Sequence, residues 1–112
     1  MNNSRKEKEE QEMTTLLEIS VTPVGTESTS YKEYVTDAVK LIKDKGLNYH
    51  IGPSSTVIEG EIDQVMEVAK DIHKHSLKQN ANRVVTNLRI EERSDKDMSI
   101  SHQMRAVKEA AQ

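Results

Sequence analysis

One carboxylate in this 112-residue chain lies beside a glycine, at a position from which it could bind a ligand. Glu59 lies between Ile58 and Gly60, near the end of segment 49–60, whose pattern predicts a strand, a tight turn and a second strand. A glycine in a strand lets another backbone or a ligand approach closely. Glu59 is either a solvated residue paired with a lysine or arginine, or an anionic group beside a pocket. Tyr49 is either a core ring with its hydroxyl at the rim or a stacking surface.

The four histidines do not predict a metal site. His73 and His75 are two positions apart on a predicted helix, so their side chains point in divergent directions. His50 and His102 are isolated in the sequence. Metal binding needs convergent ligands with suitable geometry, so we expect neither a metal ion nor another cofactor.

A set of catalytic residues is not evident either. The serines gather in predicted loops, where turn and capping chemistry accounts for them. The sequence has no glycine-rich phosphate loop, nucleophile elbow or metalloprotease motif. A small-molecule isomerase or hydrolase is therefore the least supported alternative, and we expect a protein that is not an enzyme.

Composition favours one compact soluble domain. The chain is 34% hydrophobic without Trp or Phe, so aliphatic side chains and three tyrosines must fill the core. A net charge of −3 without a basic stripe does not predict nucleic-acid binding. The chain has no cysteine, and its apolar runs are too short for a membrane span. Without an apolar signal segment at the N-terminus, the cytoplasm is the expected location.

Three regions are distinguished by their patterns. Residues 1–12 have no apolar side chain after Met1 and are predicted to be a disordered extension. Residues 13–93 carry the periodic patterns of a folded domain, and residues 94–112 a charged turn and a short helix. The strands are expected from Thr14 up to a stop at Pro23-Val24-Gly25, and at 47–51, 55–61 and 83–92, with the first helix at 30–45.

The ends of the helices are also predicted from residue types. Gly46 fits the left-handed position after the first helix, and Asp63 is expected to cap the second. Asn80 or Asn82 is expected to end that second helix. Its apolar stripe is predicted to be Ile62, Val65, Met66, Ala69, Ile72 and Leu77.

The order strand, helix, strand, strand, helix, strand predicts an α+β, ferredoxin-like βαββαβ sandwich. Two right-handed strand-helix-strand units interleave into a four-stranded antiparallel sheet, with both helices on one face and the first and third strands central. The other face is expected to carry Val57 and Glu59 beside Leu16, Glu18 and Arg89. Such a mixed, uncovered face and a free last strand predict a homodimer or homotetramer.

Three segments together resemble the thiamine-binding protein family. They are residues 19–25 (Ile-Ser-Val-Thr-Pro-Val-Gly), 49–60 (Tyr-His-Ile-Gly-Pro-Ser-Ser-Thr-Val-Ile-Glu-Gly) and 83–93 (Arg-Val-Val-Thr-Asn-Leu-Arg-Ile-Glu-Glu-Arg). The middle segment is the most specific, because its Pro, Thr-Val-Ile and Glu-Gly recur at fixed offsets. The resemblance implies a non-catalytic homo-oligomer that binds thiamine or a related aminopyrimidine.

Candidate ligand contacts follow from that resemblance. Thiamine is a thiazolium cation joined to an aminopyrimidine, so a carboxylate can accept from the ring amine or lie near the positive charge. The expected binding residues are Glu59, Tyr49, Thr22, Ser55, Thr56 and Thr86. The alternative is a structural or regulatory interaction module without a small-molecule ligand, because ferredoxin-like sheets support many unrelated functions.

Overall fold

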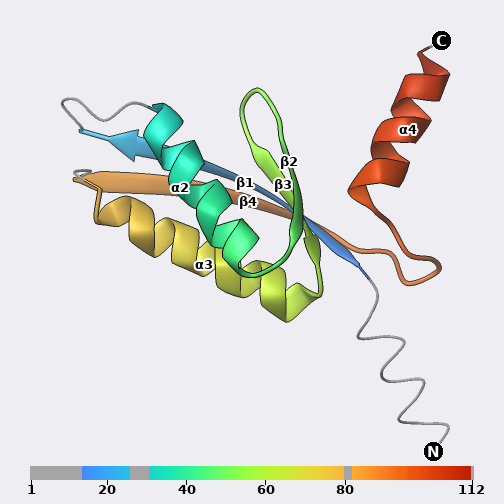
Figure 1. The fold of residues 1–112 in the computed structure, drawn as a ribbon, viewed down its shortest axis with the longest axis horizontal. Helices are drawn as coiled ribbons and strands as arrows, with labels where there is room; N and C mark the ends of the chain where they lie inside the picture. The colour runs from blue at the N-terminus through green and yellow to red at the C-terminus, as the bar shows by residue number, and fades with distance from the viewer. Residues whose placement is uncertain (1–13, 26–30, 80–81, 112) are drawn as a thin grey trace, which may run out of the picture.

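The computed structural model describes residues 14–25, 31–79 and 82–111, so the predicted disorder of residues 1–12 lies outside the described part of the chain. Strands and helices alternate there in the predicted order, followed by a C-terminal helix (Figure 1). The elements are β1 (Thr15–Val24), α2 (Tyr31–Asp44), β2 (Asn48–Ile51), β3 (Thr56–Gly60), α3 (Ile62–Leu77), β4 (Arg83–Glu91) and α4 (Ile100–Ala110).

The four strands form one antiparallel sheet in the order β2-β3-β1-β4. The first and third strands are central, and α2 and α3 cover the same face, as Figure 1 shows. The predicted ferredoxin-like α+β fold is therefore confirmed. None of the described helices is both long enough and apolar enough to cross a bilayer.

The core lies between the sheet and these two helices. Leu17 of β1 is directly opposite Ile58 of β3, and both side chains are fully buried. Because successive strand residues alternate between faces, this register places every second residue of each strand toward the helices. The buried cluster is aliphatic throughout: Leu17, Ile19, Ile42, Ile58, Val65, Val68, Ala69 and Ile72.

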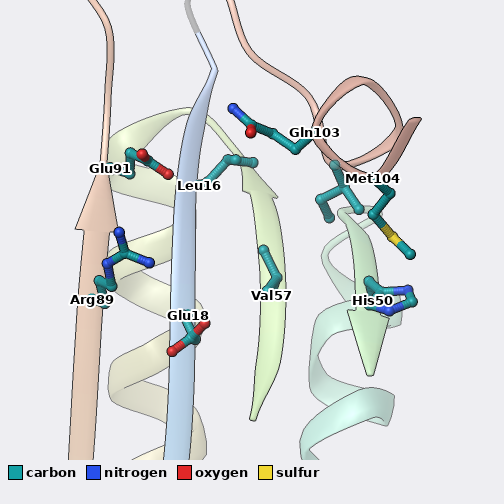
Figure 2. Close-up of a pocket in the computed structure, with 9 residues that line it drawn as sticks. Leu16, Glu18, His50, Val57, Arg89, Glu91, Gln103 and Met104 are labelled. Carbon is teal, nitrogen blue, oxygen red and sulfur yellow. The ribbon is translucent and has the colours of Figure 1, made fainter. Parts of the chain in front are cut away.

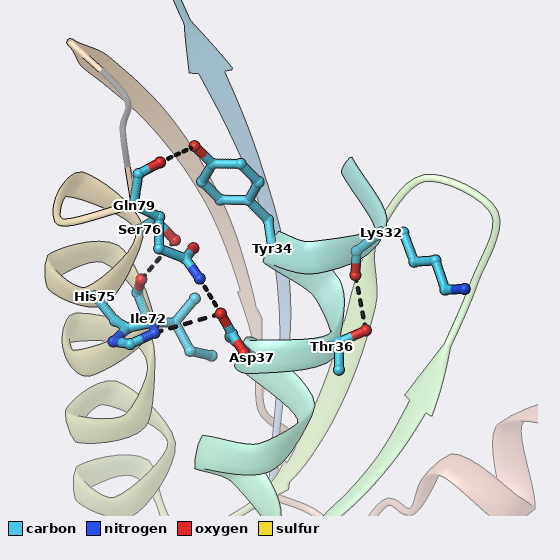
Figure 3. A network of polar contacts seen from close by, with 8 residues as sticks. All are labelled: Lys32, Tyr34, Thr36, Asp37, Ile72, His75, Ser76 and Gln79. Atoms are coloured by element: carbon cyan, nitrogen blue, oxygen red, sulfur yellow. Dashed lines mark hydrogen bonds and ion pairs between the residues drawn. The ribbon is translucent and has the colours of Figure 1, made fainter. Parts of the chain in front are cut away.

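Polar contacts join the start of α2 to the end of α3 (Figure 3). The hydroxyl of Tyr34 donates to the carbonyl oxygen of Gln79 at 2.7 Å. Asp37 accepts from the Gln79 side-chain amide and lies 3.5 Å from Nε2 of His75. At the other end of α2, Gly46 has φ 71°, the left-handed conformation predicted for it. The contacts of Tyr34 and Asp37 therefore join the two helices that cover the core.

The start of α3 differs from the prediction. Glu61, not Asp63, occupies the N-cap position, with extended backbone angles and a backbone N–H that donates to Oε1 of Gln64 at 3.3 Å. Because β3 runs straight into the helix at Gly60, the last extended residue becomes the cap. Asp63 lies inside the first turn, where its negative charge interacts favourably with the helix dipole.

The buried stripe and the end of α3 also differ from the prediction. Val68 and Ser76 are buried, whereas Met66 and Leu77 are exposed, because the helix is rotated so that its contact with the sheet runs along the row containing Val65 and Ile72. The Ser76 hydroxyl is satisfied within the helix by the carbonyl oxygen of Ile72 at 2.8 Å. The helix ends at Leu77 with Lys78 as C-cap, before either predicted asparagine.

β1 ends at Val24, within the stop predicted at Pro23-Val24-Gly25, and Pro23 itself still belongs to the strand. The pairing of β1 with β3 ends at Ile19, so Pro23 lies where β4 is the only paired neighbour within the described sheet. A proline without an N–H is tolerated at such a singly paired position. Gly25, with φ 78°, then turns the chain away from the strand.

The core register predicts the cost of removing one side chain from it. Replacing Ile58 by Ala should lower the free energy of unfolding by about 2–5 kcal/mol, because lost apolar burial and a cavity add together. Urea unfolding measures this change. Val107→Ala is the matched control, since Val107 is 70% exposed and its truncation should change stability by less than about 0.5 kcal/mol. Equal effects of the two substitutions would contradict the register.

Candidate functional site

The face of the sheet opposite α2 and α3 presents its side chains in cross-strand rows. In the first row Leu16 stands between Glu59 of β3 and Glu91 of β4. In the second row Glu18 stands between Val57 of β3 and Arg89 of β4, and His50 of β2 continues the row beside Val57. Directly opposed residues in antiparallel strands have Cβ atoms about 4.5–5.5 Å apart, so the residues of each row are neighbours on this face.

Glu59 ties the C-terminal helix to this face. Its Oε2 accepts the backbone N–H of Ile100, the first residue of α4, at 2.7 Å. Its Oε1 accepts from Nδ2 of Asn48 in β2 at 2.8 Å, which orients the carboxylate. A carboxylate at a helix N-terminus satisfies an orphan donor and interacts favourably with the positive end of the helix dipole. Glu59 therefore positions α4.

Further contacts hold the segment that leads into α4. Ser99 is the N-cap residue, and its hydroxyl oxygen accepts the backbone N–H of His102 at 3.0 Å. Asp97 accepts the backbone N–H of Thr14 at 2.6 Å, and this hydrogen bond lowers the pKa of the Asp97 carboxyl below its ordinary value. Met98, between them in sequence, is buried. Hydrogen bonds of Asp97 and Ser99, on either side of Met98, therefore stabilise the start of the helix.

Between α4 and the sheet lies a hollow of about 170 Å³, which we call the apolar hollow. Figure 2 shows its lining side chains, with Met104 extending from α4 toward His50 on β2. Its surface is mostly hydrocarbon, but four side chains that bear or can acquire charge stand around it. The lining residues are Leu16, Glu18, His50, Val57, Arg89, Glu91, Ile100, Gln103 and Met104.

Among the described residues, the charged side chains around the apolar hollow form no ion pairs with one another. Glu18 and Arg89 are directly opposed across β1 and β4, yet neither forms an ion pair with another described residue, and the same holds for Glu91. Two carboxylates and one guanidinium remain beside an apolar surface. This arrangement suits a flat ligand that is positively charged over part of its length.

Three of the predicted ligand residues lie on or beside this face. Glu59 stands next to Leu16 at the edge of the apolar hollow, although both of its oxygens already accept hydrogen bonds. Ser55 lies in the turn before β3 and lines a second hollow on the same face. Thr22 is exposed and opposite Val85, two rows beyond Glu18 and so about 14 Å away along the strand.

The other three predicted residues lie on the helix side of the sheet. Tyr49 packs against the core opposite Ile58, and Thr56 is buried opposite Ile19. The hydroxyl of Thr86 lies 2.7 Å from Nδ1 of His73 in α3. A crevice lined by Thr56 has a volume of only about 20 Å³, too little for an aromatic ring. The sheet therefore separates the six predicted residues into two groups, one on or beside each face.

The sequence prediction omitted the residues that α4 brings to the site. Strand periodicity placed Glu18 and Arg89 on the open face, but Gln103 and Met104 reach it through the bond between Glu59 and Ile100, which are 41 positions apart. The signal in the sequence was a strand face that mixes apolar and charged residues, followed by an amphipathic C-terminal segment that could pack against it. Within the described residues, three or more histidine or acidic side chains do not gather in a way that could hold a metal ion.

Comparison with known sequences gives a consistent assignment. The family model described as thiamine-binding protein matches residues 17–108. A UPF0045 protein of Methanothermobacter thermautotrophicus is 38% identical over 82% of this chain and 94% of its own length. A relative in Bacillus subtilis is 30% identical over 82% of this chain and 92% of its own length.

Solved structures agree with the sequence matches. A hypothetical protein of Methanocaldococcus jannaschii superposes with a TM-score of 0.77 at 30% identity, covering 86% of this chain and 97% of that one. A Thermotoga maritima protein assigned provisionally to thiamine biosynthesis or salvage gives a TM-score of 0.69 at 28% identity, covering 84% and 98%. With the match to the family model over most of its length, this chain belongs to the thiamine-binding protein family.

Proposed function

We propose that this protein binds thiamine or a related aminopyrimidine in the apolar hollow and does so without catalysing a reaction. The family assignment supports the ligand class. The observation that carries the location is the pair of carboxylates, Glu18 and Glu91, left without an ion-pair partner among the described residues at the wall of an apolar cavity. A ligand with a permanent positive charge and flat rings complements both the negative charge of these carboxylates and the shape of the cavity.

Each part of the ligand has a suitable surface in the hollow. Leu16 and Val57 form an aliphatic floor, and the thioether of Met104 is well suited to contact with an aromatic ring. His50 and Gln103 offer hydrogen-bonding groups to ring nitrogens and the exocyclic amine. At about 4 Å and an effective dielectric near 20, a carboxylate attracts the thiazolium by about 4 kcal/mol before desolvation is subtracted.

The lining residues also favour binding over chemistry. A covalent mechanism requires a nucleophile held beside a base, and no hydroxyl or thiol belongs to the described residues that line the apolar hollow. The volume of about 170 Å³ is below the roughly 300–1,000 Å³ of typical ligand pockets. One ring of thiamine therefore occupies the apolar hollow, and the rest of the molecule extends along the sheet.

Self-association is the second part of the proposal. β4 is at the edge of the sheet, and Leu88 and Ile90 on it are 42% and 46% exposed although they face the helix side. An edge strand with exposed apolar side chains is a template for pairing with another chain. We infer that two copies pair along β4 to give a homodimer, and that a homotetramer would consist of two such dimers. An interaction module without a ligand, the alternative function, would use the same strand.

The role of Glu59 can be tested apart from the ligand. Glu59→Ala removes the acceptor for Ile100, so amides Gln103 to Val107 of α4 should exchange hydrogen about fivefold faster or more, as for loss of a helix cap. Hydrogen exchange followed by NMR measures this change. Glu67→Ala, on the exposed side of α3, is the control and should leave α4 unchanged. Unaltered protection of α4 in Glu59→Ala would show that the helix is held by other contacts.

Glu18 should matter for affinity rather than for folding. Glu18→Gln keeps the shape but removes the charge, so the dissociation constant for thiamine should rise about tenfold. Isothermal titration gives this value, and circular dichroism checks the fold. Glu33→Gln on α2, at the opposite face, serves as the matched control. An unchanged affinity in Glu18→Gln would place the cation elsewhere.

The oligomer is tested by charging the edge strand. A double variant, Leu88→Lys with Ile90→Lys, should be monomeric in size-exclusion chromatography with light scattering, because like charges then oppose each other across the interface. Val107→Lys on α4 adds a charge at an exposed apolar position away from β4 and should leave the assembly intact. An assembly that survives the double variant would rule out pairing through β4.

A further inference from the structure

A second hollow, with a volume of about 280 Å³, continues the apolar hollow along the same face. We call it the polar hollow. Both hollows are lined by Glu18 and Arg89, so they meet at this opposed pair. Beyond it, hydrocarbon gives way to hydroxyl and amide groups, supplied by Ser20, Ser54, Ser55 and Asn87. Along β1 the face therefore changes from the mostly hydrocarbon apolar hollow, which Glu91 also lines, through Glu18 and Arg89, to neutral polar groups.

The positions of these polar groups are fixed by the sheet and the turn. Ser20 and Asn87 are directly opposed and form the row next to Glu18 and Arg89. The turn between β2 and β3 is closed by the backbone N–H of Gly52, which donates to the carbonyl oxygen of Ser55 at 2.8 Å. A Cβ on Gly52 would lie 3.2 Å from that same oxygen, so glycine permits the tight closure. The serines are thus held at the end of the hollow.

Arg89 is the one cation among the described residues that line the polar hollow. Opposite charges directly across two strands normally attract each other, but Arg89 and Glu18 make no ion pair within the described part of the chain. A guanidinium that makes no ion pair among the described residues and has hydroxyl and amide groups around it is suited to a phosphate, which it can bind through two parallel hydrogen bonds.

The order of these surfaces matches the order of groups in a phosphate ester of thiamine. The pyrimidine, the thiazolium cation and the hydroxyethyl group follow one another in the ligand, and the ester extends from the last of these. We propose that the polar hollow binds this phosphate, so that the protein prefers thiamine monophosphate to thiamine. The inference rests on the proposed function, with the pyrimidine in the apolar hollow, the thiazolium at Glu18, and the phosphate at Arg89 and the serines.

Isothermal titration with two probes, thiamine and thiamine monophosphate, tests the preference. In the unaltered protein thiamine monophosphate should bind at least about tenfold more tightly than thiamine. This factor corresponds to the contribution of one charge-assisted hydrogen-bonded pair. In Arg89→Gln the ratio of the two affinities should fall to about one, whatever happens to the affinity for thiamine itself. Ser54→Ala combined with Ser55→Ala should lower the ratio by a smaller factor.

Arg83→Gln is the matched control, because Arg83 lies on the same strand and face, six residues and about 20 Å away. It should keep the full preference. If thiamine binds and the monophosphate binds no tighter, the phosphate site is wrong and the proposed function stands. If neither probe binds, the proposed function itself fails. A preference that persists in Arg89→Gln would place the phosphate away from the polar hollow.

Discussion

The hydrogen bond from the backbone N–H of Ile100 to the carboxylate of Glu59 is the contact on which the site depends. Residues 101–110 of α4 are exposed, so the helix gains little from burial and relies on its N-terminal ties. Glu59 belongs to β3, and its carboxylate is oriented by Asn48 of β2. The positions of these two strands therefore determine where the first residue of α4 lies. This bond, together with the Asp97 contact and buried Met98, holds the first turn of α4 over the cavity.

The sheet divides the molecule into two surfaces with different tasks. The side covered by α2 and α3 is aliphatic and closely packed, and its small crevice leaves no room for a ring. The other side keeps Glu18, Arg89 and Glu91 close together without pairing them among the described residues. The core thus supplies stability from one face, and the opposite face retains the charges that the proposed ligand requires.

Local sequence was sufficient for the framework and insufficient for the site. The alternation of Leu17 and Ile19 fixed which face of β1 is buried, and the same periodicity placed Glu59 on the other face. It wrongly predicted Asp63 as the cap of α3, because the cap position, occupied by Glu61, depends on where β3 ends. It also grouped Tyr49 and Thr86 with Glu59, since residue type alone does not show which side of a sheet a hydroxyl occupies. The docking of α4 depends on a contact between distant residues, which no local pattern contains.

The central claim is that thiamine occupies the open face beneath the start of α4. Titrating the ¹⁵N-labelled protein with thiamine, with amide chemical shifts as the readout, tests it most directly. We expect saturable shifts concentrated at Leu16, Glu18 and Val57 and in the first turn of α4, with the amides around Tyr34 on the helix side unmoved. Saturable shifts confined to α2 and the helix side, with none beside α4, would contradict it.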